Sequence, residues 1–419
     1  MAGGVRPATN VGRKRGGTVS LIAWMDTSPD EQRRVREIVA LFADKGTLDE
    51  LGIGQIRDAF SDCMFPGTST IQTRARYLLF VPWIYERSAK SSAKGTVRRR
   101  GEAQERRFIT TMKLANQSEG LIGRQAGVNV KTLPSAIYWS ALVRYGILTS
   151  PLSLDQIGSP ARLVTGADEL VDRIVGDWSP TLPAPPPTFP QEVEGGFDLT
   201  AEEASWLRDR IMLAAPGSVL THLLRSDATL SADSTAPWNE PACTDGDSDT
   251  TSIVHHAEMF SLAMEGAALL YTLLVAERYE ERKFTSLVEP TSYYADQLKR
   301  WASDRQESSD QLYRWSTKKM WRMAYDLAPR IGAPTRQFVD QWIQAVVSGR
   351  ADDAANDPGL RSMIAARESM KKGNQSRLTN ERMLARWQGA SGQGRLVFRW
   401  PLVKRLVTDI KEGLARAGT

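Results

Sequence analysis

The sequence predicts a mainly α-helical, multi-domain protein with a winged-helix-like (helix-turn-helix) segment and minor β structure. Apolar residues recur at helical spacing along much of the chain, whereas the alternating pattern of half-buried strands is scarce. Helix-start signals are also present, such as Thr200 followed three residues later by Glu203. Because 419 residues exceed one ordinary hydrophobic core, we expect more than one domain.

The expected elements follow from caps, apolar spacing and breakers, taken in chain order. A short extended segment at residues 19–26 precedes a helix that Pro29 and the acidic pair Asp30 and Glu31 favour at its start. A second extended segment is expected at residues 395–400. Helices are expected at residues 27–44, 49–65, 106–116, 122–128, 133–145, 197–214, 254–282, 294–305, 308–328, 333–349, 378–387 and 401–417.

Changes in composition predict the boundaries between domains. Residues 179–196 are rich in proline and read as a stiff, extended linker. The predicted organisation is a disordered basic tail (1–18), an N-terminal helical domain (19–178) that contains the winged-helix-like segment (106–150), the linker (179–196), an acidic helical domain (197–355) and a basic C-terminal region (356–419).

The charge distribution has two basic ends around an acidic middle. Residues 1–146 hold 23 Lys and Arg against 13 Asp and Glu, residues 147–360 hold 18 against 32, and residues 361–419 hold 13 against 4. These segments carry +10, −14 and +9, which give the total of +5. Basic ends are typical of proteins that face a polyanion such as DNA or RNA. The alternatives are that the ends fold back on the acidic middle or face an acidic partner protein.

Residues 120–148 resemble a helix-turn-helix of winged-helix type. Residues 122–128 form the first helix of this expected pair, residues 129–131 the turn and residues 133–145 the second helix. Two features count against this interpretation: Pro134 is tolerated only in the first turn of a helix, and the spacing between Gly127 and Gly146 is slightly long. The alternative is an ordinary helical hairpin. The expected exposed readers of DNA are Lys131, Thr132, Ser135 and Tyr138.

Residues 65–87 combine small hydroxyl residues, arginines and an apolar block. Helix N-termini bind anions through backbone N–H groups, so the hydroxyls and arginines form a candidate anion site. The spacing of a phosphate-binding loop is absent, and the alternative is a capped, buried element. The candidate anion-binding residues are Thr68, Ser69, Arg74 and Arg76.

The C-terminal region mixes cations with aromatic residues, a composition that suits nucleic-acid backbones and base stacking. The alternative is a docking domain whose tryptophans are core and whose cations are solvated. The candidate nucleic-acid-binding residues here are Lys371, Lys372, Arg377, Arg395 and Arg399.

No motif in the sequence predicts a cofactor, a metal site or a catalytic residue. The two cysteines, Cys63 and Cys243, lack metal-type spacing and are typical of a reducing cytosol. The acidic run at residues 245–250 lacks the Gly and Glu of a calcium loop. The longest apolar block that the sequence shows, residues 77–85, is too short to span a bilayer. We therefore expect a cytoplasmic protein without a membrane partner.

Four stretches of the chain resemble a bacterial family known only as a full-length domain of unknown function. They are residues 21–39, residues 49–85, residues 134–147 and "GRLVFRW" at residues 394–400. The resemblance implies that the gene lies in a phage-defence (antiviral) or mobile-element cluster, and that the partner protein is a helicase or nuclease. The leading hypothesis is a non-catalytic, DNA- or RNA-associated accessory or scaffold subunit. The alternatives are a protein scaffold without nucleic-acid contact and a divergent nuclease or phosphate-handling enzyme.

Overall fold

The computed structural model describes residues 49–158, 163–164, 173–174, 176–392 and 394–416. The tail, extended segment and first helix that the sequence predicts therefore lie outside the described residues. Within the described part the fold is mainly α-helical, as predicted. The described strands are β1 (Leu163–Val164) and β2 (Arg173–Ile174), which pair antiparallel.

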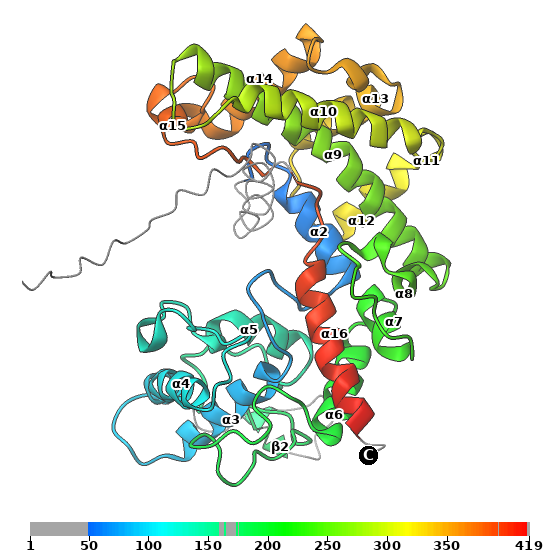
Figure 1. Ribbon diagram of the computed structural model, residues 1–419. Helices are drawn as coiled ribbons and strands as arrows, with labels where there is room; N and C mark the ends of the chain where they lie inside the picture. The colour runs from blue at the N-terminus through cyan, green and yellow to red at the C-terminus, as the bar shows by residue number, and fades with distance from the viewer. Residues whose placement is uncertain (1–48, 159–162, 165–172, 175, 393, 417–419) are drawn as a thin grey trace, which may run out of the picture.

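The helices carry the labels of Figure 1. They are α2 (Gly54–Met64), α3 (Tyr77–Lys90), α4 (Val97–Leu114), η1 (Gly127–Asn129), α5 (Pro134–Arg144), α6 (Ala201–Ala214), α7 (Val219–Arg225), η2 (Pro237–Asn239), α8 (Pro241–Thr244), α9 (Ser248–Glu281), α10 (Pro290–Glu307), α11 (Ser309–Arg314), α12 (Thr317–Leu327), α13 (Ala333–Val347), η3 (Arg350–Asp353), α14 (Pro358–Lys372), η4 (Gly373–Gln375), α15 (Glu381–Ala385) and α16 (Trp400–Ala415).

The described chain has two lobes joined along α16 (Figure 1). The lower lobe contains α3, α4 and α5, and the upper lobe is built on α9 with α10, α13 and α14. The last helix, α16, lies between the two lobes and packs against α6 and α7. The chain crosses from upper to lower lobe between α2 and α3, so residues 65–76 lie at the junction of the lobes.

The upper lobe is organised by α9, a helix of 34 residues. Asp247 caps its start by accepting a hydrogen bond from the N–H of Thr250 at 2.8 Å. By length and composition α9 is apolar enough to cross a membrane, but 89% of its most apolar window is buried inside the protein. Trp301 of α10 and Trp342 of α13 donate their indole N–H groups to α9 carbonyls. Helix α9 is therefore the core helix of this lobe.

The proline-rich segment at residues 179–196 is packed on the lower lobe, where the sequence predicts an extended linker. Phe189 is buried and lies against the rings of Phe80, Trp83 and Phe108. The indole of Trp83 donates a hydrogen bond to the carbonyl of Pro183 at 2.7 Å. Aromatic burial of this kind stabilises the packed position, so the segment forms a wall of the lower lobe.

Several predicted elements differ from the structure, and three α-helices were not predicted. The helix expected at residues 308–328 is two helices, α11 and α12, because the chain turns at Trp315. Residues 395–400 form no strand, since Phe398 and Arg399 have positive φ angles of 49° and 67°. Residues 122–128 contain turns and the start of η1 in place of a first α-helix. Helices α7, α8 and α14 were missed.

Candidate nucleic-acid interface

Most of the C-terminal cations that the sequence predicts as nucleic-acid contacts are paired within the protein. Lys372 and Arg377 both contact the buried carboxylate of Glu50. Arg395 pairs with Glu265 at 2.9 Å, and Arg399 pairs with Asp62 at 2.6 Å. Lys371 is exposed.

The aromatic residues of the C-terminal region are core residues. Trp387, Phe398 and Trp400 are all at most 3% exposed, so their faces are covered and do not offer a stacking platform. The covered aromatic rings match the docking alternative, whose tryptophans are core, whereas the ion pairs differ from the solvated cations that this alternative expects. The C-terminal region therefore gives little support to a nucleic-acid contact.

The expected DNA-reading residues of the helix-turn-helix segment divide into two groups. Helix α5 forms as predicted, with Pro134 in its first turn, and Lys131 and Thr132 before it are exposed. Ser135 and Tyr138 were predicted to be exposed, but they are 1% and 0% exposed. Since the first helix of the pair is also absent, α5 is a packed helix whose groove-facing residues are not free to enter DNA.

Tyr138 connects α5 to the junction between the lobes. Its hydroxyl accepts hydrogen bonds from the backbone N–H groups of Thr73 at 2.7 Å and Arg74 at 3.0 Å, and it donates to the Arg74 carbonyl at 2.9 Å. The backbone of residues 73–74 has no regular secondary structure of its own to satisfy these groups. Tyr138 therefore serves as a partner for an irregular buried loop.

Replacing Tyr138 with Phe is expected to lower the free energy of unfolding by about 1–3 kcal/mol, because two backbone donors lose their acceptor inside the protein. Denaturant unfolding of the two proteins measures this difference. Nucleic-acid affinity, measured while both proteins are folded, is expected to be unchanged. A loss of affinity with unchanged stability would restore Tyr138 as a DNA-reading residue.

The candidate anion site at residues 67–76 does not start a helix. Helix α3 begins at Tyr77, so the hydroxyls of Thr68 and Ser69 lie well before its first turn. Thr68 donates its hydroxyl to the carbonyl of Phe65 at 2.7 Å, whereas the buried hydroxyl of Ser69 has no partner among the described residues. A cavity of about 10 Å³ lies beside Thr68 and Ser69, roughly the space of one water. The geometry of a phosphate-binding helix start is therefore absent.

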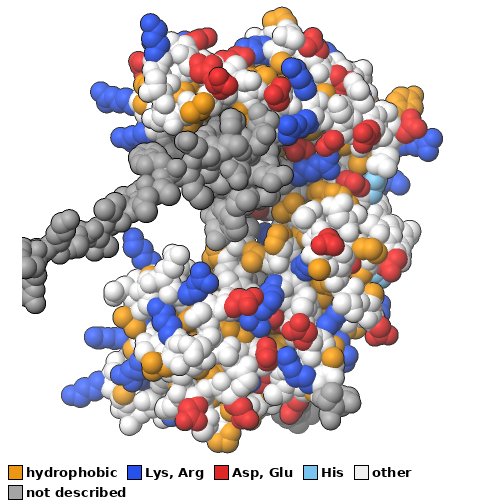
Figure 2. All heavy atoms as spheres, in the orientation of Figure 1, with side chains coloured by type: hydrophobic (Ala, Val, Ile, Leu, Met, Phe, Trp, Pro, Cys, Tyr) orange, Lys and Arg blue, Asp and Glu red, His pale blue; other side chains and the backbone are white. Residues whose placement is uncertain are grey.

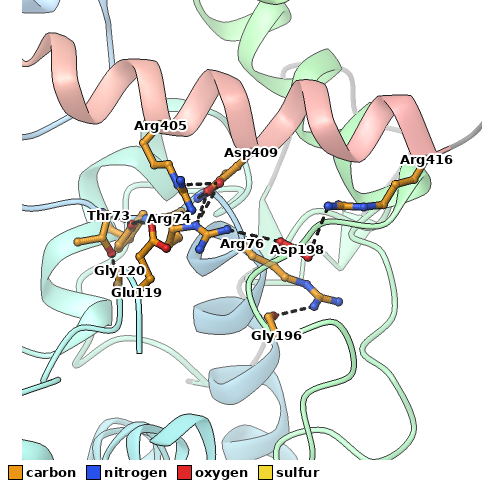
Figure 3. Close-up of polar contacts among 12 residues, drawn as sticks. Thr73, Arg74, Arg76, Glu119, Gly120, Gly196, Asp198, Arg405, Asp409 and Arg416 are labelled. Carbon is orange, nitrogen blue, oxygen red and sulfur yellow. Dashed lines mark hydrogen bonds and ion pairs between the residues drawn. The ribbon is translucent and has the colours of Figure 1, made fainter. Parts of the chain in front are cut away.

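Arg74 and Arg76 are held by groups of the protein itself (Figure 3). The Nε atom of Arg74 donates to both carboxylate oxygens of Asp409 in α16, at 3.1 and 2.9 Å. Arg76 donates to the carbonyls of Glu194 and Gly196 at 2.7 and 2.8 Å.

Both side chains are almost fully buried and clamp the junction between α3, α16 and the segment before α6. Arg76 also pairs with Glu203 at 2.8 Å. The second oxygen of Glu203 accepts the N–H of Thr200, and Glu203 donates its own N–H to the Thr200 hydroxyl, so the predicted capping box is present. The two arginines are thus junction residues.

The basic surface of the lower lobe was not singled out from the sequence. Residues 87–131 contain 11 Lys and Arg against 3 Asp and Glu. The sequence predicts a helix at residues 106–116, but α4 already begins at Val97, where the Thr96 hydroxyl accepts the N–H of Arg99 at 3.2 Å. A Thr cap before an Arg-rich run was a readable signal for this earlier start.

The three acidic residues of this segment are committed to other partners. Glu102 accepts a hydrogen bond from Arg98 at 2.8 Å, and Glu105 is fully buried. Glu119 pairs with Arg405 of α16 at 3.2 Å. The segment therefore presents a surplus of positive charge that its own carboxylates do not neutralise.

Helix geometry places several of these cations on one face of α4. Arg99, Arg106 and Lys113 are seven residues apart, so they form one stripe along the helix. The guanidinium of Arg106 donates to the carbonyls of Val128 and Val130 at 3.0 and 2.9 Å, which fixes the neighbouring loop against α4. We define the α4 basic surface as Arg99, Arg106, Lys113, Arg124 and Lys131. Figure 2 shows Lys and Arg side chains projecting from the lower lobe, where α4 and α5 lie in Figure 1.

Glu105 holds α4 against α5 beneath this surface. Its Oε1 atom accepts the backbone N–H of Ser135 at 2.6 Å, and its Oε2 atom accepts the Ser135 hydroxyl at 2.7 Å and the Tyr85 hydroxyl at 3.3 Å. Burial raises the pKa of Glu105 to about 7, against the opposing effect of these hydrogen bonds. The negative carboxylate lies at the start of α5, where the helix dipole favours it.

This raised pKa predicts a pH dependence of stability. A carboxyl group whose pKa is higher in the folded than in the unfolded state binds its proton more tightly when folded. The stability it contributes is present below the unfolded pKa, near 4.5, and is lost as the pH rises through about 7. Urea unfolding of wild type and Glu105→Gln is measured between these two pH values. As the pH rises, the free energy of unfolding of wild type is expected to fall relative to that of the variant by about a few kcal/mol. A constant difference would contradict the assignment.

Among the described residues, no group of three or more His, Cys, Asp or Glu is placed to hold a metal ion. The acidic run at residues 245–250 instead contains the cap of α9, Asp247.

Comparisons with known proteins give a family but no function. One family model matches residues 19–414, and its description is a family of unknown function (DUF6361). No curated protein and no solved structure matches the chain.

Proposed function

The chain belongs to the family of unknown function DUF6361, whose model matches nearly its full length, and we propose that it is a non-catalytic, nucleic-acid-associated accessory or scaffold subunit. In this proposal the α4 basic surface contacts the phosphate backbone of DNA or RNA. A helicase or nuclease partner in a defence or mobile-element system belongs to the same proposal, and the gene neighbourhood of family members tests it.

The observation that carries the proposal is the unneutralised charge of the α4 basic surface. Elsewhere in the described chain, predicted nucleic-acid contacts such as Arg377 and Arg399 face carboxylates at 2.6 Å. On α4, by contrast, Arg99 is exposed and the nearby carboxylates are engaged by other groups. When a stripe of cations binds along a row of phosphates, the counterions condensed on the nucleic acid are released, and this release favours binding.

The arrangement favours backbone contact over base reading. The residues that would enter a major groove from α5 are buried, so base-specific hydrogen bonds from that helix are not part of the proposal. Lys131 and Arg124 lie in the loop beside α4, which widens the cationic face. We therefore propose binding with little sequence preference, dominated by electrostatics.

Fluorescence anisotropy with labelled duplex DNA at low and at physiological salt tests this function. The proposal expects binding at low salt that weakens as salt is added, with similar affinity for unrelated sequences. Absence of binding at low salt overturns it and leaves an acidic protein partner as the occupant of the α4 basic surface. Incubation of the bound complex with divalent metal ions checks the non-catalytic part, because cleavage of the DNA would contradict it.

A further inference from the structure

A groove of about 730 Å³ lies on the face of α4 next to the basic surface. The end of α3 and residues 190–191 of the proline-rich segment form its other walls. A cavity of this size falls within the range that small organic ligands occupy. The groove is lined by Arg87, Lys90, Ser91, Gln104, Arg107, Phe108, Thr111, Pro190 and Gln191.

The charged side chains of the groove are all positive. Arg87, Lys90 and Arg107 are exposed at its walls. Lys90 pairs at the rim with Glu86 at 2.7 Å, and one N–H of Arg87 is donated to the Phe189 carbonyl at 3.2 Å. An exposed pair one helical turn apart is weak, so it leaves most of the attraction for an anion intact. The groove therefore favours a ligand that carries negative charge.

The amide of Gln104 presents a hydrogen-bond acceptor that phosphate alone does not satisfy. Its Oε1 atom is buried and has no hydrogen-bond partner among the described residues. A buried acceptor without a donor costs about 1–3 kcal/mol, which a ligand N–H group would recover on binding. Phosphate oxygens are acceptors, so a ligand that satisfies both Gln104 and the cations combines a phosphate with a hydrogen-bond donor, such as the N–H of a base.

The groove continues along α4 into a second cavity of about 530 Å³. Thr111 and Gln191 line both cavities. Leu114, which is 81% exposed, adds an apolar wall to the second cavity. Glu192 and Glu194 also line the second cavity, so a ligand that extends into it must keep its negative charge at the Arg107 end.

We propose that the groove receives one nucleotide of an unpaired nucleic-acid strand. The phosphate lies between Arg87, Lys90 and Arg107, and an N–H group on the Watson–Crick edge of the base donates to Gln104 Oε1. Every base has such a donor on this edge, and pairing in a duplex occupies it, so the groove selects single strands without selecting sequence. This inference rests on the proposed function, because it assigns the strand type that the basic lobe prefers.

The test compares the affinity of the full-length protein for one oligonucleotide in single-stranded and duplex form. Gln104→Leu is expected to weaken single-strand binding about fivefold, the effect of one lost hydrogen bond, and to leave duplex binding unchanged. Gln125→Leu removes an exposed amide outside the groove and is the matched control. Thr111→Trp fills the groove and is expected to weaken single-strand binding by about tenfold or more through steric exclusion.

The outcomes separate the groove from the proposed function. If both groove variants bind the single strand as tightly as wild type while wild type binds both forms, the groove assignment is wrong and the α4 basic surface stands. If wild type binds neither form, the proposed function fails and the groove assignment fails with it. Equal losses in Gln104→Leu and Gln125→Leu also overturn the groove assignment.

Discussion

Reversing three charges of the α4 basic surface, in the variant Arg99→Glu/Arg124→Glu/Lys131→Glu, is expected to weaken duplex DNA binding on the order of a hundredfold at low salt. Each substitution removes an attraction to phosphate and adds a repulsion of similar size. All three side chains are exposed, so the fold is expected to be retained. Anisotropy titration of wild type and variant measures the loss.

The control for this prediction changes the net charge equally at another place. The variant Arg314→Glu/Lys318→Glu/Arg330→Glu reverses three exposed cations on and around α11 and α12, away from the lower lobe. We expect its affinity to fall only slightly, because long-range attraction is screened at ordinary ionic strength. Equal losses in the two variants would show that net charge, and not the α4 basic surface, governs binding.

Replacing Asp409 with Ala is expected to lower the free energy of unfolding by about 3–5 kcal/mol, the largest stability effect that we predict. The Asp409 side chain is 1% exposed and receives hydrogen bonds from the Arg74 side chain and the Ala75 backbone. Removing the carboxylate leaves the Arg74 guanidinium buried, with Asp198 as a more distant partner at 3.7 Å. Denaturant unfolding of the variant measures the loss.

Two further variants identify the cause of that loss. Glu281→Ala breaks an exposed pair with Arg278 and is expected to change stability by less than about 0.5 kcal/mol. Arg74→Met combined with Asp409→Leu removes both buried charges and is expected to recover part of the loss, because no charge is then left unpaired. If the double variant is as unstable as Asp409→Ala, packing rather than the ion pair explains the effect.

The helices could largely be predicted from local signals in the sequence. The capping box at Thr200 and Glu203 and the first-turn proline of α5 satisfy backbone and steric requirements that do not depend on the rest of the fold. Residues 122–128 were predicted wrongly as a helix. There Gly123 and Gly127 take positive φ angles of 84° and 57°, which end helical structure.

The candidate site was harder to predict, because it depends on which charges the fold leaves unpaired. Arg377 and its partner Glu50 are separated by more than 300 residues, and Arg74 and Asp409 are similarly distant. No spacing rule connects such pairs, so the basic C-terminal region looked like a nucleic-acid interface. The short Arg-rich run at the start of α4 was not singled out, although Arg99 within it stays exposed.

The proline-rich segment is a second place where composition alone predicts the wrong structure. Its prolines predict an extended chain, but Phe189 carries the aromatic surface that packs it onto α3 and α4. The wall of the groove therefore comes from a segment that sequence composition assigns to a linker.

The most direct test of the α4 basic surface is the salt dependence of duplex DNA binding for wild type and for Arg99→Glu/Arg124→Glu/Lys131→Glu. The logarithm of the binding constant falls linearly with the logarithm of the salt concentration, with a slope close to the number of phosphates that the protein neutralises. We predict a clear slope for wild type and a slope smaller by about one for each phosphate that the variant no longer neutralises. Equal slopes for the two proteins would contradict a phosphate-binding role for the α4 basic surface.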